Sequence, residues 1–273
     1  MSTPRIAFIG AGNMAGSMIG GLLDSGHPAA AICAADPFAE SLARLGQIGD
    51  IATFSDNAQA ADGADVVILA VKPQVMADAA RSVAAQVAAG GSLVISIAAG
   101  VTLDTLAERL GGDAAIVRCM PNTPALLRCG ASGLYANKNT SDGQRQHAEF
   151  ILGAVGLTRW VESEQELDAI TALSGSGPAY FFLLLEAMVD AGCELGLDRD
   201  VATELAQQTA LGAARMARES DVDLVELRRR VTSPGGTTQA AVESFERDGL
   251  REIVASAMRA ANDRAAEMAS EMG

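Results

Sequence analysis

A glycine-rich turn near the start of the chain separates two segments of different periodicity. Residues 5–10 form an apolar run typical of a buried β-strand, and residues 13–25 carry apolar side chains at helical spacing. Between them lie Gly10, Gly12 and Ala15 in the pattern G-x-G-x-x-A. The two glycines permit a tight turn and let the backbone approach a pyrophosphate, while the alanine allows close helix packing. This pattern predicts a dinucleotide site; a glycine turn that serves packing alone is the alternative.

The alternation of strand and helix continues to about residue 161. The strand-like segments are rich in Val, Ile and Ala, and they comprise residues 5–10, 30–36, 50–54, 65–71, 92–98 and 114–120. Nearly continuous apolar strands are buried on both faces, as in a parallel sheet covered by helices. The order therefore predicts an α/β, Rossmann-type doubly wound sheet over residues 1–161.

The remaining segment, residues 162–273, has helical patterns throughout, which predict an all-α domain. Its stretch 180–188 is apolar on nearly every face, so this helix needs to be covered. A domain of this size has too small a core to enclose such a helix alone. We therefore expect a homodimer that forms through the helical domain.

Charge and composition argue against several classes of protein. The net charge of −14 disfavours a nucleic-acid partner, because phosphate binding over a large surface needs a basic face. The four cysteines form no C-x-x-C pair and there is no histidine cluster, so no metal site is predicted. The apolar run at the N-terminus is too short for a signal sequence or a membrane span. We expect a cytoplasmic protein with no membrane partner.

Several residues follow the predicted strands at the sheet edge where nucleotides bind. Asp36 ends the second strand, where an acid accepts a ribose 2′-OH and favours NADH over NADPH; alternatively it caps the next turn. Lys72 can offset the charge of a phosphate or carboxylate, or can be a solvated turn lysine. Residues 120–127 contain two prolines and predict a rigid loop over the nicotinamide.

The helical half offers few groups for acid catalysis. Residues 162–273 contain no histidine and no lysine, which leaves Tyr180 and hydroxyl groups. Reduction of a ketone requires an acid to protonate the developing alkoxide. A protonated cyclic imine instead accepts hydride at carbon and becomes a neutral amine, so the protein needs only to position and neutralise it. This composition favours reduction of a C=N bond.

Residues 232–238 interrupt the helical periodicity with a turn of hydroxyl and glycine residues, TSPGGTT. A helix is expected to begin near Thr238, so the backbone N–H groups of the turn form a nest suited to a carboxylate. A threonine hydroxyl adds a contact for a ring nitrogen. The alternative is an ordinary Ser/Thr cap before a helix.

These motifs resemble the pyrroline-5-carboxylate reductase family over essentially the whole chain. The resemblance rests on FIGAGNMA, AVKP, VISIAAGV, MPNTPALL, SGSGPAYFF and VTSPGGTT, in this order and spacing. It implies a Rossmann domain followed by a helical domain that interlocks with a second subunit, with five dimers gathered into a decamer. It also implies the reduction of L-1-pyrroline-5-carboxylate to L-proline by NADPH or NADH.

The resemblance also assigns roles to individual residues. Those expected at the cofactor are Ile9, Gly10, Ala11, Gly12, Asn13, Met14, Asn57, Ala70, Val71, Lys72, Pro73, Ile97, Ala98 and Ala99; Asp36, Met120, Pro121 and Asn122 complete the set. Those expected at the substrate are Ser233, Gly235, Gly236, Thr237 and Thr238, together with Ser176 and the acids Glu164 and Asp221. Ser233 and Thr238 are expected to act in catalysis, with the Thr238 hydroxyl on the ring nitrogen.

Three alternatives stay open. A β-hydroxyacid dehydrogenase of similar layout needs a lysine in the helical domain, and this chain has none there. A general imine reductase would not need a carboxylate nest at residues 233–238. A cofactor-sensing dimer would bind the nucleotide without turnover. The preference between NADPH and NADH is also open, because family members that prefer NADPH place Ser, Asn or Arg where this chain has Ala34, Ala35 and Asp36.

Overall fold

The computed structural model describes residues 3–272, and the chain divides into two compact units. One unit is Met1–Ser176 together with Ala261–Gly273, and the other is Gly177–Ala260. The domain boundary that the sequence predicts after residue 161 stays a prediction.

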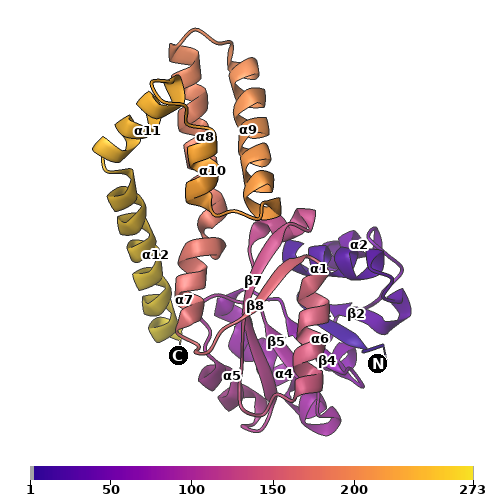
Figure 1. The fold of residues 1–273 in the computed structure, drawn as a ribbon. Helices are drawn as coiled ribbons and strands as arrows, with labels where there is room; N and C mark the ends of the chain where they lie inside the picture. The colour runs from indigo at the N-terminus through magenta and orange to yellow at the C-terminus, as the bar shows by residue number, and fades with distance from the viewer. Residues whose placement is uncertain (1–2, 273) are drawn as a thin grey trace. The chain divides into compact units, whose positions relative to one another are not determined.

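The first unit is built on an eight-stranded sheet with the order β3-β2-β1-β4-β5-β6-β7-β8 (Figure 1). The strands are β1 Ile6–Ile9, β2 Ile32–Ala35, β3 Ala52–Phe54, β4 Val66–Leu69, β5 Leu93–Ser96, β6 Ala115–Met120, β7 Gly130–Ala136 and β8 Gly156–Trp160. All neighbours are parallel except β6 and β7. The strand order reverses between β1 and β4, which is where sheets of this type open a crevice for a ligand. The predicted doubly wound α/β sheet is confirmed.

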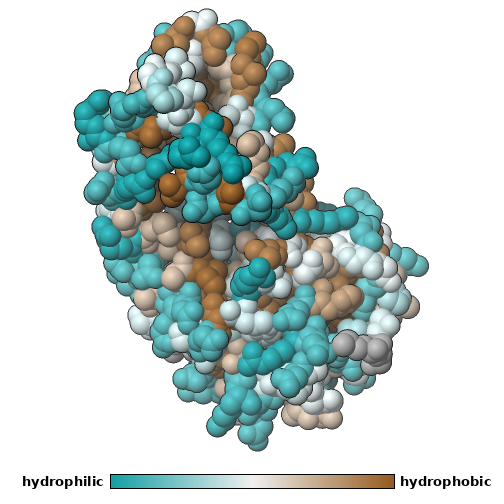
Figure 2. All heavy atoms as spheres, in the orientation of Figure 1, coloured by the Kyte–Doolittle hydropathy of each residue, from teal (hydrophilic) through white to brown (hydrophobic). Residues whose placement is uncertain are grey.

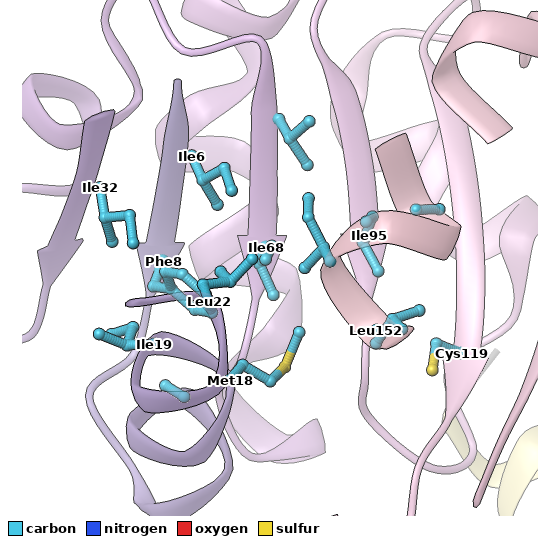
Figure 3. Packing of buried hydrophobic residues seen from close by; sticks show 14 of the residues in the cluster. Ile6, Phe8, Met18, Ile19, Leu22, Ile32, Ile68, Ile95, Cys119 and Leu152 are labelled. Carbon is cyan, nitrogen blue, oxygen red and sulfur yellow. The ribbon is translucent and has the colours of Figure 1, made fainter. Parts of the chain in front are cut away.

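Helices cover both faces of this sheet. They are α1 Asn13–Asp24, α2 Ala39–Gly46, α3 Asn57–Ala61, α4 Met76–Gly90, α5 Leu103–Leu110, α6 Asp142–Gly153 and α7 Glu166–Ile170. Because strand side chains alternate between faces, Ile6 and Phe8 of β1 enter one core and Ala7 and Ile9 the other. Figure 3 shows the first core, where Phe8 lies beside Leu22 and Ile19 of α1, and Leu152 of α6 lies near Cys119 of β6.

Two strands and one short helix were not identified from the sequence. β7 contains Gly130 and Gly133, and β8 alternates between half-buried and exposed residues. Neither shows the continuous apolar run that marked the central strands, because β8 is the edge strand and β7 lies next to it. The five-residue helix α3 is too short to show a period.

The second unit is helical throughout its described elements. It contains α8 Gly177–Glu194, α9 Arg199–Glu219, α10 Leu224–Arg230, α11 Thr237–Arg247 and the first part of α12 Leu250–Met272. Its buried apolar cluster is small and consists of Val189, Ala202 and Ala206. Large apolar side chains are exposed instead, and Figure 2 shows such residues on the surface of the helical unit.

The helical run Glu166–Glu194, which includes α8, is long and apolar enough to cross a membrane by length and composition alone. A helix that a second subunit covers has the same length and composition. This property therefore does not distinguish a membrane-spanning helix from a helix at a subunit interface. On α8, Phe181 and Phe182 are each 65% exposed in the single chain.

Candidate functional site

The turn between β1 and α1 has the shape that a pyrophosphate requires. Gly10 has a φ of +101°, and a Cβ there would lie 2.7 Å from the carbonyl oxygen of Ala70. A Cβ on Gly12 would meet nothing within 4 Å, so there is open space beside the turn. Gly12 is the N-cap of α1, and no side chain in residues 3–272 caps this end of the helix. The uncapped N–H groups and the helix dipole fit a phosphate anion.

The carboxyl ends of four strands meet around this turn. Gly10 donates a backbone hydrogen bond to Ala35 at 2.8 Å, and Ala70 donates to Ile9 at 2.8 Å. Ile97 donates to Leu69 at 3.3 Å. The structure thereby brings together the residues expected at the cofactor in three segments, which are residues 9–14, 70–73 and 97–99. The end of β6, with residues 120–122, follows next to β5 in the sheet.

Asn57 and Lys72 lie on the turns and helix starts of the same unit. Asn57 is the first residue of α3, and its amide donates to the hydroxyl of Ser82 on α4 at 3.0 Å. Lys72 is exposed in the turn after β4 and begins a short 3₁₀ helix as its N-cap. Its ammonium group is therefore accessible to an anion.

Asp36 bonds to the backbone of the glycine turn itself. Its Oδ2 accepts from the Ala11 N–H at 2.8 Å, and its Oδ1 accepts from the Phe38 N–H at 2.9 Å. The carboxylate thus caps the turn after β2 and also holds the turn after β1. Because a carboxylate has about four acceptor positions, further acceptor capacity remains for a ribose hydroxyl.

The SGSGP motif lies beside the end of β6. Asn122, which follows β6, is 9% exposed and donates through Nδ2 to the carbonyl oxygen of Ser174 at 3.0 Å. Its Oδ1 accepts from the N–H of Ala131 in β7 at 2.8 Å. The segment that carries Ser176 is therefore held at the carboxyl edge of the sheet. Nδ2 and Oδ1 of Asn122 thus each have a partner within the protein, which fixes the orientation of the amide.

Glu164 takes part in a buried ion pair. Its Oε1 accepts from Arg118 Nη1 and from the N–H of Leu103, both at 2.9 Å, and the Arg118 side chain is only 7% exposed. Asp168 lies 4.0 Å from the same guanidinium, and burial raises the pKa of its carboxyl group while Arg118 lowers it. The proximity of Glu164 to the substrate stays a prediction, since the structure gives this carboxylate a structural partner.

The loop between α10 and α11 has the features of an anion site. Gly235 has a φ of +72°, which favours glycine. Gly236 donates to Ser233 O at 3.0 Å and is the N-cap of α11, and no side chain in the described residues caps this helix. The helix begins at Thr237, one residue before the predicted start. The N–H of Gly235 is bonded to the side chain of Gln239 at 2.7 Å, so the first N–H groups of α11 are the donors left for a ligand.

The arginines before this loop are paired with acids. Arg229 and Arg230 bond to Glu226 at 2.6 and 2.9 Å, and Arg228 bonds to Glu246 at 3.1 Å. The two neighbouring guanidinium groups lower the pKa of Glu226 to about 2. Because these positive charges are compensated, the backbone of the loop supplies the local attraction for an anion.

Two features of the site were not anticipated from the sequence. Arg118 forms the buried ion pair with Glu164, and an arginine inside the apolar run of β6 was the available signal. Gln239 accepts a hydrogen bond from the Gly235 N–H, and nothing in the sequence around Gln239 indicates this contact.

Asp221, which was expected near the substrate, lies in the connection between α9 and α10.

Histidine, cysteine and acidic side chains form no cluster of three or more suited to a metal ion within residues 3–272. Cys119 is buried in the sheet, and burial raises the pKa of its thiol to about 12, so it is not a nucleophile at neutral pH.

Comparisons with known proteins cover both units. Residues 164–268 match the family model described as pyrroline-5-carboxylate reductase dimerisation, and residues 5–100 match that of NADP oxidoreductase, coenzyme F420-dependent. A pyrroline-5-carboxylate reductase of Pseudomonas aeruginosa is 54% identical over 273 residues, which is 100% of both chains. The structure of one from Coxiella burnetii is 44% identical with a TM-score of 0.95, covering 98% of this chain and 99% of that chain. A Plasmodium falciparum structure with NADP bound is 28% identical with a TM-score of 0.84 and the same coverage.

Proposed function

The chain belongs to the pyrroline-5-carboxylate reductase family, and we propose that residues 233–238 hold the substrate while the enzyme reduces L-1-pyrroline-5-carboxylate to L-proline with NAD(P)H. The observation that carries the reaction is the full-length similarity to enzymes of that name. The geometry of the glycine turn after β1 and of the loop before α11 supports the placement of cofactor and substrate.

The chemistry requires little from the protein beyond binding and orientation. The bound reduced nicotinamide supplies a hydride. The substrate, as a protonated imine, accepts that hydride at the ring carbon, and the electron pair of the C=N bond moves to nitrogen. The product leaves as an amine that takes its next proton from water. No acid has to protonate an oxygen, which suits a helical half without histidine or lysine.

We assign the cofactor to the carboxyl edge of the first unit. The uncapped start of α1 and Gly12 would hold the pyrophosphate, and Asp36 would accept a ribose hydroxyl. Lys72 would neutralise phosphate charge, and the ends of β5 and β6 would flank the nicotinamide.

The substrate carboxylate is assigned to the start of α11. The N–H groups of Thr237 and Thr238 and the helix dipole provide a preorganised site for it. The Thr238 hydroxyl would accept from the ring N–H, and Ser233 would line the same loop. Ser176 would contribute from the edge of the sheet, and Glu164 would have to share its carboxylate with Arg118.

The protein forms a homodimer through its helical half, where the dimerisation model matches and where α8 exposes Phe181 and Phe182 in the single chain. Burial of such side chains contributes about 1.5–3 kcal/mol each. We propose that five dimers assemble further into a decamer, as the family resemblance implies. We also propose that the enzyme is cytoplasmic, as expected from the short apolar run near residue 5.

The assay that tests the function uses the purified full-length chain, with loss of nicotinamide absorbance as the readout. Turnover is expected with pyrroline-5-carboxylate. With 1-pyrroline, which lacks the carboxylate, kcat/KM should fall at least about 100-fold, because the N–H groups of the loop lose their partner. Equal turnover of both rings would indicate a general imine reductase. Cofactor binding without turnover would indicate a cofactor sensor.

A further inference from the structure

A five-residue π-helical turn, Thr171–Gly175, separates α7 from α8. The Ser176 N–H donates to Thr171 O at 2.8 Å, which is the i to i−5 bond of a π-helix. In an α-helix the Ser174 carbonyl would accept from residue 178, but Pro178 has no N–H. The sequence therefore leaves the Ser174 carbonyl in need of a donor from elsewhere.

Asn122 supplies that donor. Its Nδ2 lies 3.0 Å from Ser174 O, and its Oδ1 accepts from the Ala131 N–H at 2.8 Å. The side chain is nine-tenths buried, and the amide joins the end of β6, the start of β7 and the π-helical turn in one hydrogen-bond network.

Close backbone packing holds the same turn against the sheet. A Cβ on Gly175 would lie 2.5 Å from Cε of Met120, and a Cβ on Gly133 would clash with Cδ1 of Ile170. The absence of these two methyl groups lets the helical run lie directly on β6 and β7. Because β6 ends at the carboxyl edge of the sheet, the turn is fixed at the edge where a cofactor binds.

We propose that Asn122 is a positioning residue for hydride transfer, which acts by fixing the π-helical turn and with it Ser176. The inference rests on the proposed function, since it concerns the same reaction. Its two bonds tie the π-helical turn to the ends of β6 and β7 and thereby help to determine where Ser176 lies at the sheet edge. A displacement of about 1 Å in such a group costs on the order of 10²-fold in rate.

The test compares Asn122→Asp with the wild-type full-length enzyme. Aspartate keeps the shape and the acceptor for Ala131, but it places an oxygen against the Ser174 carbonyl. We expect kcat to fall about 10- to 100-fold while the affinity for NADPH is unchanged. The deuterium isotope effect on kcat, measured with nicotinamide deuterated at the transferred position, should rise because hydride transfer becomes limiting. A purely structural role would lower the melting temperature and leave the isotope effect unchanged.

Asn139→Asp is the matched control. Its Nδ2 also donates to a carbonyl, that of Ala114 at 3.4 Å, just before β6 at the opposite edge of the sheet. This variant should keep the wild-type kcat. If Asn122→Asp does not fold, Gly175→Ala provides a second test, because its methyl group would have to push aside the end of the Met120 side chain and so alter the contact between the turn and β6.

Turnover of pyrroline-5-carboxylate by the wild type is measured first, and its absence would refute the proposed function itself. If the wild type turns over and the folded variants keep its kcat and isotope effect, the positioning role is wrong. A parallel loss of NADPH affinity in Asn122→Asp would also overturn it, because Asn122 would then act on the cofactor.

Discussion

The two units of this chain bury their apolar residues in different ways. In the first unit the strands are enclosed on both faces, and Phe8 and Ile68 are fully buried. In the second unit the most apolar helix, α8, exposes Phe181, Phe182 and Leu183 in the single chain. The first unit therefore contains its own core, whereas the second has only a small cluster of buried apolar residues and leaves its most apolar helix to be covered in the dimer. We therefore expect substitutions in the first unit to affect cofactor binding, and substitutions on the exposed face of α8 to affect dimerisation.

The largest effect is expected from charges on α8. The double variant Phe181→Asp, Phe182→Asp would place two carboxylates in the interface, and each buried charge costs several kcal/mol. Sedimentation should show loss of the dimer, and activity should fall more than about 100-fold. Glu194→Gln on the same helix is the control and should remain dimeric. A dimeric, active double variant would show that α8 is not in the interface.

The glycine turn offers a contrast between stability and binding. Gly12→Ala adds a methyl group to open space, so the melting temperature should be kept while the cofactor loses its approach to the backbone and its Kd rises more than about 10-fold. Gly10→Ala should lower both the melting temperature and the affinity for the cofactor, because the site has a positive φ and a Cβ would contact Ala70. Calorimetry and fluorescence titration measure the two quantities. Unchanged cofactor affinity in Gly12→Ala would exclude the turn from the site.

Thr238→Ala tests the helical unit without disturbing the first unit. Loss of one preorganised hydroxyl should lower kcat by roughly 10²-fold. Dimerisation and cofactor affinity should stay at wild-type values, because Thr238 is an exposed residue in the first turn of α11. Steady-state kinetics and sedimentation provide the readouts, and wild-type kinetics would remove this residue from the reaction.

Asp36→Ser should change the ratio of cofactors by a smaller amount. Removal of the carboxylate takes an acceptor from a ribose hydroxyl and a negative charge from the neighbourhood of a 2′-phosphate, so kcat/KM should shift toward NADPH by about 10-fold. The lost bond to the Ala11 N–H should also destabilise the first unit by about 1 kcal/mol. If the cofactor ratio does not change, Asp36 is only a cap.

The smallest effect concerns pH and the first unit. His27 is 6% exposed, and burial lowers its pKa below the ordinary 6.5, while a bond to the Pro4 carbonyl raises it. A lowered pKa means that stability is fully present above pH 6.5 and is lost as the pH falls through the lowered value. Urea unfolding at a series of pH values should show a smaller loss of stability on acidification in His27→Gln than in the wild type. Parallel pH profiles would exclude His27 as the cause.

The sequence predicted the central sheet because β1, β4 and β5 are apolar on both faces, which only a covered parallel sheet explains. It did not predict β7 and β8, because glycine and alternating exposure remove that signal at the sheet edge. The apolar stretch of α8 predicted a partner subunit, because a helix that is apolar on nearly every face has to be covered and the helical domain is small.

The sequence predicted where the parts of the site lie better than it predicted their hydrogen bonds. Motif spacing located the glycine turn and the loop at residues 233–238, because both depend on glycine and on a helix start. Spacing could not determine which polar groups are already bonded. Asp36 to Ala11, Asn122 to Ser174 and Gln239 to Gly235 are contacts between side chain and backbone that only the folded chain reveals.

The most direct test of the account is a crystal structure of the dimer with oxidised nicotinamide cofactor and a non-reactive carboxylated ring. The account predicts the carboxylate on the N–H groups of Thr237 and Thr238, and the ring nitrogen within hydrogen-bond distance of the Thr238 hydroxyl. It would be contradicted by an empty loop at residues 235–238 and a titrating side chain against the carbon that accepts hydride.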